Sequence, residues 1–215
     1  MGLDIYFHKL KKNENVETEN VTDWGVISEE SDRQSREELT KVYDAAISSL
    51  RKAKNYNSAY NRVMKKLFKF SNYPQFDYKA LGVSYDYQSG KYSYNQVPIE
   101  VFLKERDNIL TRHYAPYIAY FRKANFVYAF FSDKLVNECA WVTRLDLKDL
   151  IDRCERVLND HSLAEELLPT RAGFFFGSTE YDKWYYQDVK DCLKQMKKLL
   201  EDFADDEAIY VVMSW

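Results

Sequence analysis

The apolar repeat near the end of the chain constrains the fold most strongly. Apolar residues recur there at steps of four, four, three, four, three and four: Tyr181, Tyr185, Val189, Cys192, Met196, Leu199 and Phe203. Side chains at such steps share one face of an α-helix, so the spacing predicts an amphipathic helix. Thr179 and Asp182 have the spacing of a capping box. The sequence therefore predicts a helix over 179–204, the longest that it predicts.

The same periodicity predicts further helices. Ser35 and Glu38 have capping-box spacing in front of an apolar repeat, so a helix is expected to begin near residue 36. A regular apolar stripe from Tyr117 to Leu135 predicts a core helix. The helices expected besides the one at 179–204 cover 36–54, 58–70, 98–112, 116–136 and 146–159.

Strand patterns stand at both ends of the chain. Leu3, Ile5 and Phe7 alternate with polar residues, which is the period of a strand with one buried face. The run 209–213 is short, apolar and rich in β-branched residues. The polar segment 11–32 is expected to be a loop with at most one short strand at 24–27. The expected fold is a helix-dominated α+β single domain, 1–215, with a small sheet that includes both terminal strands.

Composition limits the classes of function. The net charge of −3 gives no overall case for nucleic acid, and the three cysteines and three histidines lack disulfide or metal-ligand spacing. No P-loop, dinucleotide glycine pattern or nucleophile elbow is present, so no cofactor or metal is expected and enzyme activity stays open. The chain start lacks the order of a signal peptide, and no apolar run approaches membrane-spanning length. A cytoplasmic protein without a membrane partner is expected.

The middle of the chain has a composition typical of a contact surface. The segment 45–76 contains no acidic residue, and aromatic rings lie among its basic residues. Next, two pairs of alternating tyrosines flank a Ser89-Gly90 turn, which predicts a β-hairpin whose rings share a face in a suitable register. The candidate surface residues are Lys65, Lys66, Lys69, Tyr85, Tyr87, Tyr92 and Tyr94. Basic charge with rings suits single-stranded nucleic acid. Alternatively, the lysines form solvated helix faces and the rings cover the domain's own helices.

The segment Gly173–Asp188, GFFFGSTEYDKWYYQD, contains a second candidate site. The helix expected to begin there would attract anions, although Glu180 and Asp182 oppose this field. The candidate ligand-binding residues would line a polar pocket between the terminal strands and two core helices: Asp4, Arg122, Asn125, Ser178, Thr179, Glu180 and Tyr181. In the structural alternative, Ser178–Asp182 caps the helix, Glu180 pairs with Arg122 or Arg171, and the phenylalanines seal the core.

Several segments resemble an uncharacterised family found in bacteriophages and bacterial genomes. Its members begin MGLDMYL, carry YWRKAN, and close with LPT and GFFFGSTEYD. The matching segments are Met1–Tyr6, Tyr120–Asn125, Asn137–Cys139, Leu147–Leu158 and Leu168–Asp188. Here Phe121 stands where the family tends to have tryptophan, and Tyr128 where some members have histidine, which weakens any histidine-centred chemistry. The segment 11–112 does not align, and it is either an insertion or part of the core.

Two functions are compatible with these patterns. The resemblance implies a phage or mobile-element setting and brings no established activity. The favoured hypothesis is an interaction protein that binds a host protein or nucleic acid through the tyrosine-rich hairpin and the basic helices. The other is a small-molecule binding protein or enzyme that takes an anionic, nucleotide-like ligand in the polar pocket. The first is favoured because no nucleophile or base can be assigned in the second.

Overall fold

The computed structural model describes residues 2–13, 16, 23–68, 77–86, 88–109 and 117–215. Within these ranges the protein has a helix-dominated α+β fold, which confirms the expected fold class. The chain divides into two compact units. Unit 1 comprises Met1–Ile27 and Tyr117–Trp215, and unit 2 comprises Ser28–Pro116, which overlaps most of the segment 11–112 that the family resemblance leaves uncovered.

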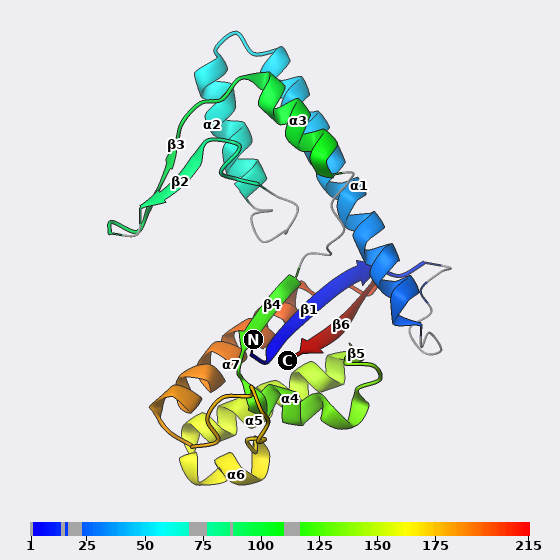
Figure 1. The fold of residues 1–215 in the computed structure, drawn as a ribbon, viewed down its shortest axis with the longest axis vertical. Helices are drawn as coiled ribbons and strands as arrows, with labels where there is room; N and C mark the ends of the chain where they lie inside the picture. Colours follow the sequence, from blue (N-terminus) through cyan, green and yellow to red (C-terminus); the bar gives the residue numbers. More distant parts are fainter. Residues whose placement is uncertain (1, 14–15, 17–22, 69–76, 87, 110–116) are drawn as a thin grey trace. The chain divides into compact units, whose positions relative to one another are not determined.

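Unit 1 is built on a four-stranded antiparallel sheet with the order β4-β1-β6-β5 (Figure 1). The strands are β1 (Asp4–Lys11), β4 (Tyr117–Arg122), β5 (Cys139–Val142) and β6 (Glu207–Ser214). β1 and β6 pair along their whole length, from Asp4 opposite Ser214 to Lys11 opposite Glu207. The prediction that both terminal strands share one sheet is therefore confirmed.

Helices cover one face of this sheet and form the main core of unit 1 (Figure 1). The helical segments are α4 (Asn125–Phe131), η2 (Ser132–Lys134), α5 (Arg144–Asn159), η3 (His161–Leu163), α6 (Ala164–Leu167) and α7 (Lys183–Asp202). Leu3, Ile5 and Phe7 lie fully buried in this core, as their alternation predicts. On the other face, Trp24 and Ile27 pack with Tyr210 in a smaller cluster.

The helix predicted over 116–136 is wrong. Its first part is β4, and only α4, which begins at Asn125, is helical. Ala119 and Phe121 point into the core with the period of a strand, while the steps between aromatic residues also fit a helix. Pairing with β1 decides between the two periods. Lys123 ends the strand with a left-handed φ of 60°, and its N–H donates to the Leu3 carbonyl at 2.7 Å.

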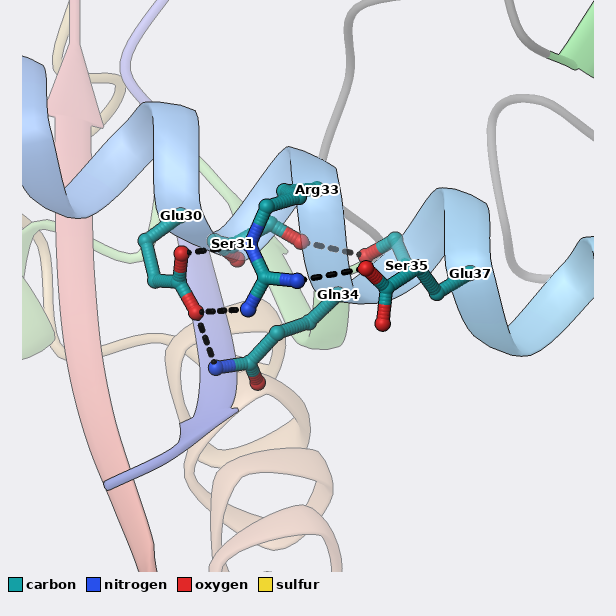
Figure 2. Close-up of polar contacts among 6 residues, drawn as sticks. All are labelled: Glu30, Ser31, Arg33, Gln34, Ser35 and Glu37. Carbon is teal, nitrogen blue, oxygen red and sulfur yellow. Dashed lines mark hydrogen bonds and ion pairs between the residues drawn. The ribbon is translucent and has the colours of Figure 1, made fainter. Parts of the chain in front are cut away.

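α1 (Trp24–Arg51) begins well before residue 36, so the capping box at Ser35 and the strand at 24–27 are wrong. Ser35 lies inside the helix, and its hydroxyl donates to the Ser31 carbonyl at 2.8 Å (Figure 2). The Arg33 guanidinium donates to Glu30 at 2.6 Å and to Glu37 at 2.5 Å, and its hydrogen bond to the Glu30 carboxylate raises the Arg33 pKa. Such pairs stabilise a polar helix that has few apolar steps. At 28 residues, α1 is also longer than the 20-residue α7.

Unit 2 combines helices with a separate two-stranded hairpin. Its helices are the part of α1 from Ser28 onward, α2 (Tyr56–Leu67) and α3 (Ile99–Ile109), and its strands are β2 (Val83–Asp86) and β3 (Lys91–Tyr94). The predictions at 58–70 and 98–112 find α2 and α3, although residues 69–70 and 110–112 lie outside the described residues. A core that includes Tyr43, Tyr60 and Phe102 joins these elements.

A charge at Phe121 tests the core of unit 1. Its ring is buried on β4 and lies 5.9 Å from the Phe7 ring. Truncating such a ring costs about 3–5 kcal/mol, and a buried carboxylate adds a desolvation cost. We therefore expect Phe121→Asp or Cys192→Asp to unfold unit 1 in thermal denaturation followed by circular dichroism. Leu145→Asp is the control, since Leu145 is 76% exposed. A wild-type melting temperature for Phe121→Asp would contradict this core assignment.

Candidate functional site

Asp4 and Arg122 of the predicted polar pocket lie opposite each other on β1 and β4. Asp4 alternates with the buried Leu3 and Ile5, so its side chain lies on the face of the sheet away from the helical core. There the Tyr120 hydroxyl donates to Asp4 Oδ1 at 2.5 Å. Burial and this hydrogen bond raise the pKa of Tyr120 to about 12. The Asp4 carboxylate therefore already accepts a hydrogen bond from a residue of its own sheet.

Asn125 is held by the loop that precedes α7. Its side chain is 3% exposed, and its Nδ2 donates to the Ser178 carbonyl at 2.8 Å and the Phe176 carbonyl at 3.4 Å. The Leu3 N–H donates to the Phe175 carbonyl of the same loop at 3.1 Å. Gly177 has a φ of 91°, and an added Cβ would lie 3.2 Å from Lys123 Cβ. The loop therefore packs closely against the end of β4.

The remaining pocket residues also have structural partners. Ser178 Oγ accepts from the Glu180 N–H at 3.1 Å, and the Thr179 carbonyl accepts from Thr170 Oγ1 at 2.9 Å. The Tyr181 hydroxyl accepts from the Thr170 N–H at 3.3 Å. The described ion pairs do not include one between Glu180 and either Arg122 or Arg171. The structure thus brings Asn125 beside Ser178, in contacts that hold the loop.

The N-cap of α7 differs from the prediction: it is an aspartate, and it lies three positions after Thr179. Asp182 is the N-cap, and its side chain accepts from the N–H groups of Trp184 and Tyr185. The capping box at Thr179 is therefore wrong, because the chain there still belongs to the loop. Asp182 could have been found from sequence, since aspartate is among the preferred N-cap residues.

The three phenylalanines of the loop have different environments. Phe176 is buried and lies edge-on to Tyr128 and Trp215, at 4.7 and 5.6 Å between ring centroids. Phe174 stands at the tip of a turn and is 92% exposed. Phe175 is half-buried. Among the three, only Phe176 belongs to the buried core, so the expectation that all three seal it is wrong.

Two cavities are lined by residues that the sequence did not single out. The one in unit 2 has a volume of about 460 Å³, between α1 and α3, where Arg106 is bonded to Asp44 at 2.8 Å. The one in unit 1 has a volume of about 290 Å³ near Trp141 and Phe203. There Arg144 is bonded to Asp205 and to the Phe203 carbonyl. The cations Arg106 and Arg144 are therefore already paired.

The described residues offer little nucleophilic or metal chemistry. No group of three or more metal-ligating side chains occurs among them. Cys154 and Cys192 are fully buried, and burial raises the pKa of the Cys139 thiol to about 11. A thiol with such a pKa is almost entirely protonated at neutral pH and is a poor nucleophile.

The hairpin of unit 2 places its described tyrosines on one face. Tyr85 lies opposite Tyr92, and Val83 lies opposite Tyr94. Opposite residues of an antiparallel pair share a face, and so do residues two apart. Tyr85, Tyr92 and Tyr94 therefore share the face expected from the sequence, whereas Tyr87 lies outside the described residues. Tyr85 and Tyr92 are 38% and 47% exposed.

The base of the hairpin is fixed to the core of unit 2. Val83 is buried, and the Asn95 N–H donates to the Gly82 carbonyl at 2.8 Å. The Tyr60 hydroxyl lies 2.7 Å from the Leu81 carbonyl and 2.8 Å from the Asn95 carbonyl. Gly82 is required here, because its φ is 77° and an added Cβ would lie 1.9 Å from the Asn95 carbonyl oxygen. The hairpin is therefore anchored at one end.

Phe68 connects the hairpin to the basic end of α2. It is the C-cap of that helix, and its ring lies 4.6 Å from the Tyr92 ring. The Tyr92 ring in turn lies 4.7 Å from the Tyr85 ring. Lys65 and Lys66 are exposed in the last turn of α2, and Lys65 is three residues before Phe68, on the same side of the helix. Lys69 lies outside the described residues. The sequence analysis missed Phe68, although its place in the basic segment was visible.

Comparisons with protein-family models, curated proteins and solved structures find no match for this chain. The phage-type resemblance therefore stays a prediction. Among the described residues, no helix has the length and apolar character needed to cross a membrane.

In the loop before α7, we expect substitutions of Phe174 and Phe176 to have different effects on stability. Phe176→Ser removes buried ring contacts with Tyr128 and Trp215 and should lower the free energy of unfolding by about 3 kcal/mol. Phe174→Ser changes an exposed side chain and should stay within about 0.5 kcal/mol of wild type. Urea unfolding of both variants measures the difference. Equal destabilisation by both changes would show that the tip of the turn is also part of the core.

The raised pKa of Tyr120 leads us to expect a loss of folding stability at high pH. Its native pKa of about 12 exceeds that of an unfolded tyrosine, about 10. The native state therefore holds this proton more tightly, and the resulting stability is complete below about pH 10 and is lost as the pH rises towards 12. Tyr120→Phe should show a shallower decline of the urea midpoint over this range than the wild type. An unchanged decline would contradict the bond to Asp4.

Proposed function

We propose that this chain is an interaction protein of the phage or mobile-element type that the motif resemblance implies. Its contact surface is the tyrosine face of the hairpin, Tyr85, Tyr92 and Tyr94, together with Phe68 and the basic end of α2. The observation that carries the proposal is the pairing of Tyr85 with Tyr92, both substantially exposed, at a fixed place in unit 2. The partner is a host protein or a nucleic acid.

The two faces of the hairpin differ in chemistry. The opposite face carries Ser84 and Ser93, whose hydroxyls are 2.6 Å apart, and the pair Asp86 and Lys91. Small polar side chains of this kind suit a face that meets water. The tyrosine face instead offers large rings with a polar tip, which give much contact area at a low cost in side-chain entropy. This asymmetry supports binding through the tyrosine face.

The structural alternative explains only part of this arrangement. Val83 packs into the core of unit 2 and Phe68 covers one side of Tyr92, so the rings do contribute to packing. The lysines at the end of α2 also suit the negative end of its helix dipole. Packing does not require two tyrosines on neighbouring strands to stay exposed, whereas a contact surface does.

Recovery of partners from a bacterial host lysate tests the proposal. The immobilised full chain should retain a set of host molecules, protein or nucleic acid, that a Tyr85→Ser/Tyr92→Ser variant loses. The matched control is Ser84→Ala/Ser93→Ala, which alters the opposite face of the same hairpin and should retain them. Circular dichroism melting confirms that each variant is folded. Identical recovery by the wild type and both variants would contradict the proposal.

A further inference from the structure

We infer that the occupant of the tyrosine face is single-stranded nucleic acid. This inference rests on the proposed function, because it names the partner of the same surface. Three features carry it: a series of rings, cations beside those rings, and carboxylates that are engaged elsewhere.

The rings form a short series across the hairpin and the end of α2. Tyr85 and Tyr92 are 4.7 Å apart between centroids, and Tyr92 and Phe68 are 4.6 Å apart. Each neighbour is tilted or edge-on, with interplanar angles of 46° and 67°. A tilted series of this kind leaves part of each tyrosine uncovered, and bases of any sequence can stack on such surfaces.

The cations beside the rings lack opposing acidic side chains. No acidic residue occurs from Ala45 to Phe76, and Lys65 and Lys66 have no carboxylate partner among the described residues. Lys65 lies one turn before Phe68, so its ammonium group can reach a phosphate that follows the ring series. The local charge is basic even though the whole chain carries a net charge of −3.

The nearby carboxylates are held in local turns. Asp86 belongs to the serine face of the hairpin, and it accepts from the Gln88 N–H at 2.9 Å and the Ser89 hydroxyl at 2.5 Å. Asp77 Oδ1 accepts from the Ala80 N–H at 3.0 Å. On the hairpin itself, the described acidic group therefore lies away from the ring series.

These features favour a single strand over the alternatives. The bases of a duplex are already stacked on one another, so exposed rings would add little to its binding. An acidic protein surface would satisfy Lys65 and Lys66, but it does not require a ring series beside them. A single strand uses both, with its bases on the rings and its phosphates on the lysines. Binding should therefore tolerate any base sequence and weaken as salt rises.

Fluorescence anisotropy with labelled oligonucleotides of about ten nucleotides tests this inference on the full chain. We expect binding to oligo-dT and to a mixed-sequence single strand, and clearly weaker binding to a duplex of the same length. Tyr85→Ser/Tyr92→Ser should weaken binding about ten-fold or more through lost stacking. Lys65→Gln/Lys66→Gln should also weaken it and should lower its salt dependence by about one to two released ions. Ser84→Ala/Ser93→Ala is the matched control and should bind as the wild type does.

The outcomes separate this inference from the proposed function. Absence of oligonucleotide binding overturns the inference. So does equal binding by wild type and Tyr85→Ser/Tyr92→Ser, because it shows attraction of a polyanion without stacking. Binding of a polyglutamate peptide that competes with the oligonucleotide and depends only on the lysines also overturns it. In each case, recovery of host proteins that depends on Tyr85 and Tyr92 would leave the proposed function standing.

Discussion

The pairing of β1 with both β6 and β4 is the constraint on which unit 1 depends. β1 lies between β4 and β6, so the sheet forms only when β6, near the end of the chain, pairs with β1, near its start. Between β1 and β4 the chain leaves the sheet at Lys11 and returns at Tyr117. Closing such a long excursion costs little more than closing a short one, about 0.6 kcal/mol for each doubling of length. A unit can therefore occupy this connection without preventing the sheet from forming.

The motifs behind the family resemblance meet at one place in unit 1. Leu3 follows the MGLD start, Lys123 and Asn125 belong to the RKAN segment, and Phe175 to Ser178 belong to GFFFGST. The Leu3 carbonyl accepts from Lys123 N–H and the Leu3 N–H donates to Phe175, while Asn125 bonds two carbonyls of the same loop. Segments that are far apart in the chain thus need one another's hydrogen bonds. These hydrogen bonds give the residues of the three segments a structural role in unit 1.

The sequence predicts an element correctly where the spacing of its apolar residues fits either a helix or a strand, but not both. The β1 alternation, the α7 repeat and the turn of the hairpin are of this kind, and the structure confirms them. The segment 116–136 carries both periods, and only the pairing with β1 selects the strand. At the start of α1 the Asp23 side chain accepts from the N–H groups of Gly25 and Val26, and further along Arg33 pairs with Glu30 and Glu37. None of these polar contacts produces an apolar period in the sequence. The contact of Phe68 with Tyr92 joins α2 to β3, which are far apart in the chain, and no local pattern can predict it.

The two candidate sites, the polar residues of unit 1 and the tyrosine face of unit 2, differ in how far their side chains already serve the fold. In unit 1, Asp4, Asn125 and Ser178 already take part in hydrogen bonds that hold the sheet and the loop. A ligand that displaced the Asn125 bonds would leave buried polar groups unpaired, at a cost of about 1–3 kcal/mol each. In unit 2, Tyr85 and Tyr92 are 38% and 47% exposed, so a partner that covers their rings would release water from apolar surface. The polar residues of unit 1 therefore serve its fold, whereas the exposed rings of unit 2 offer the surface on which the proposed recognition rests.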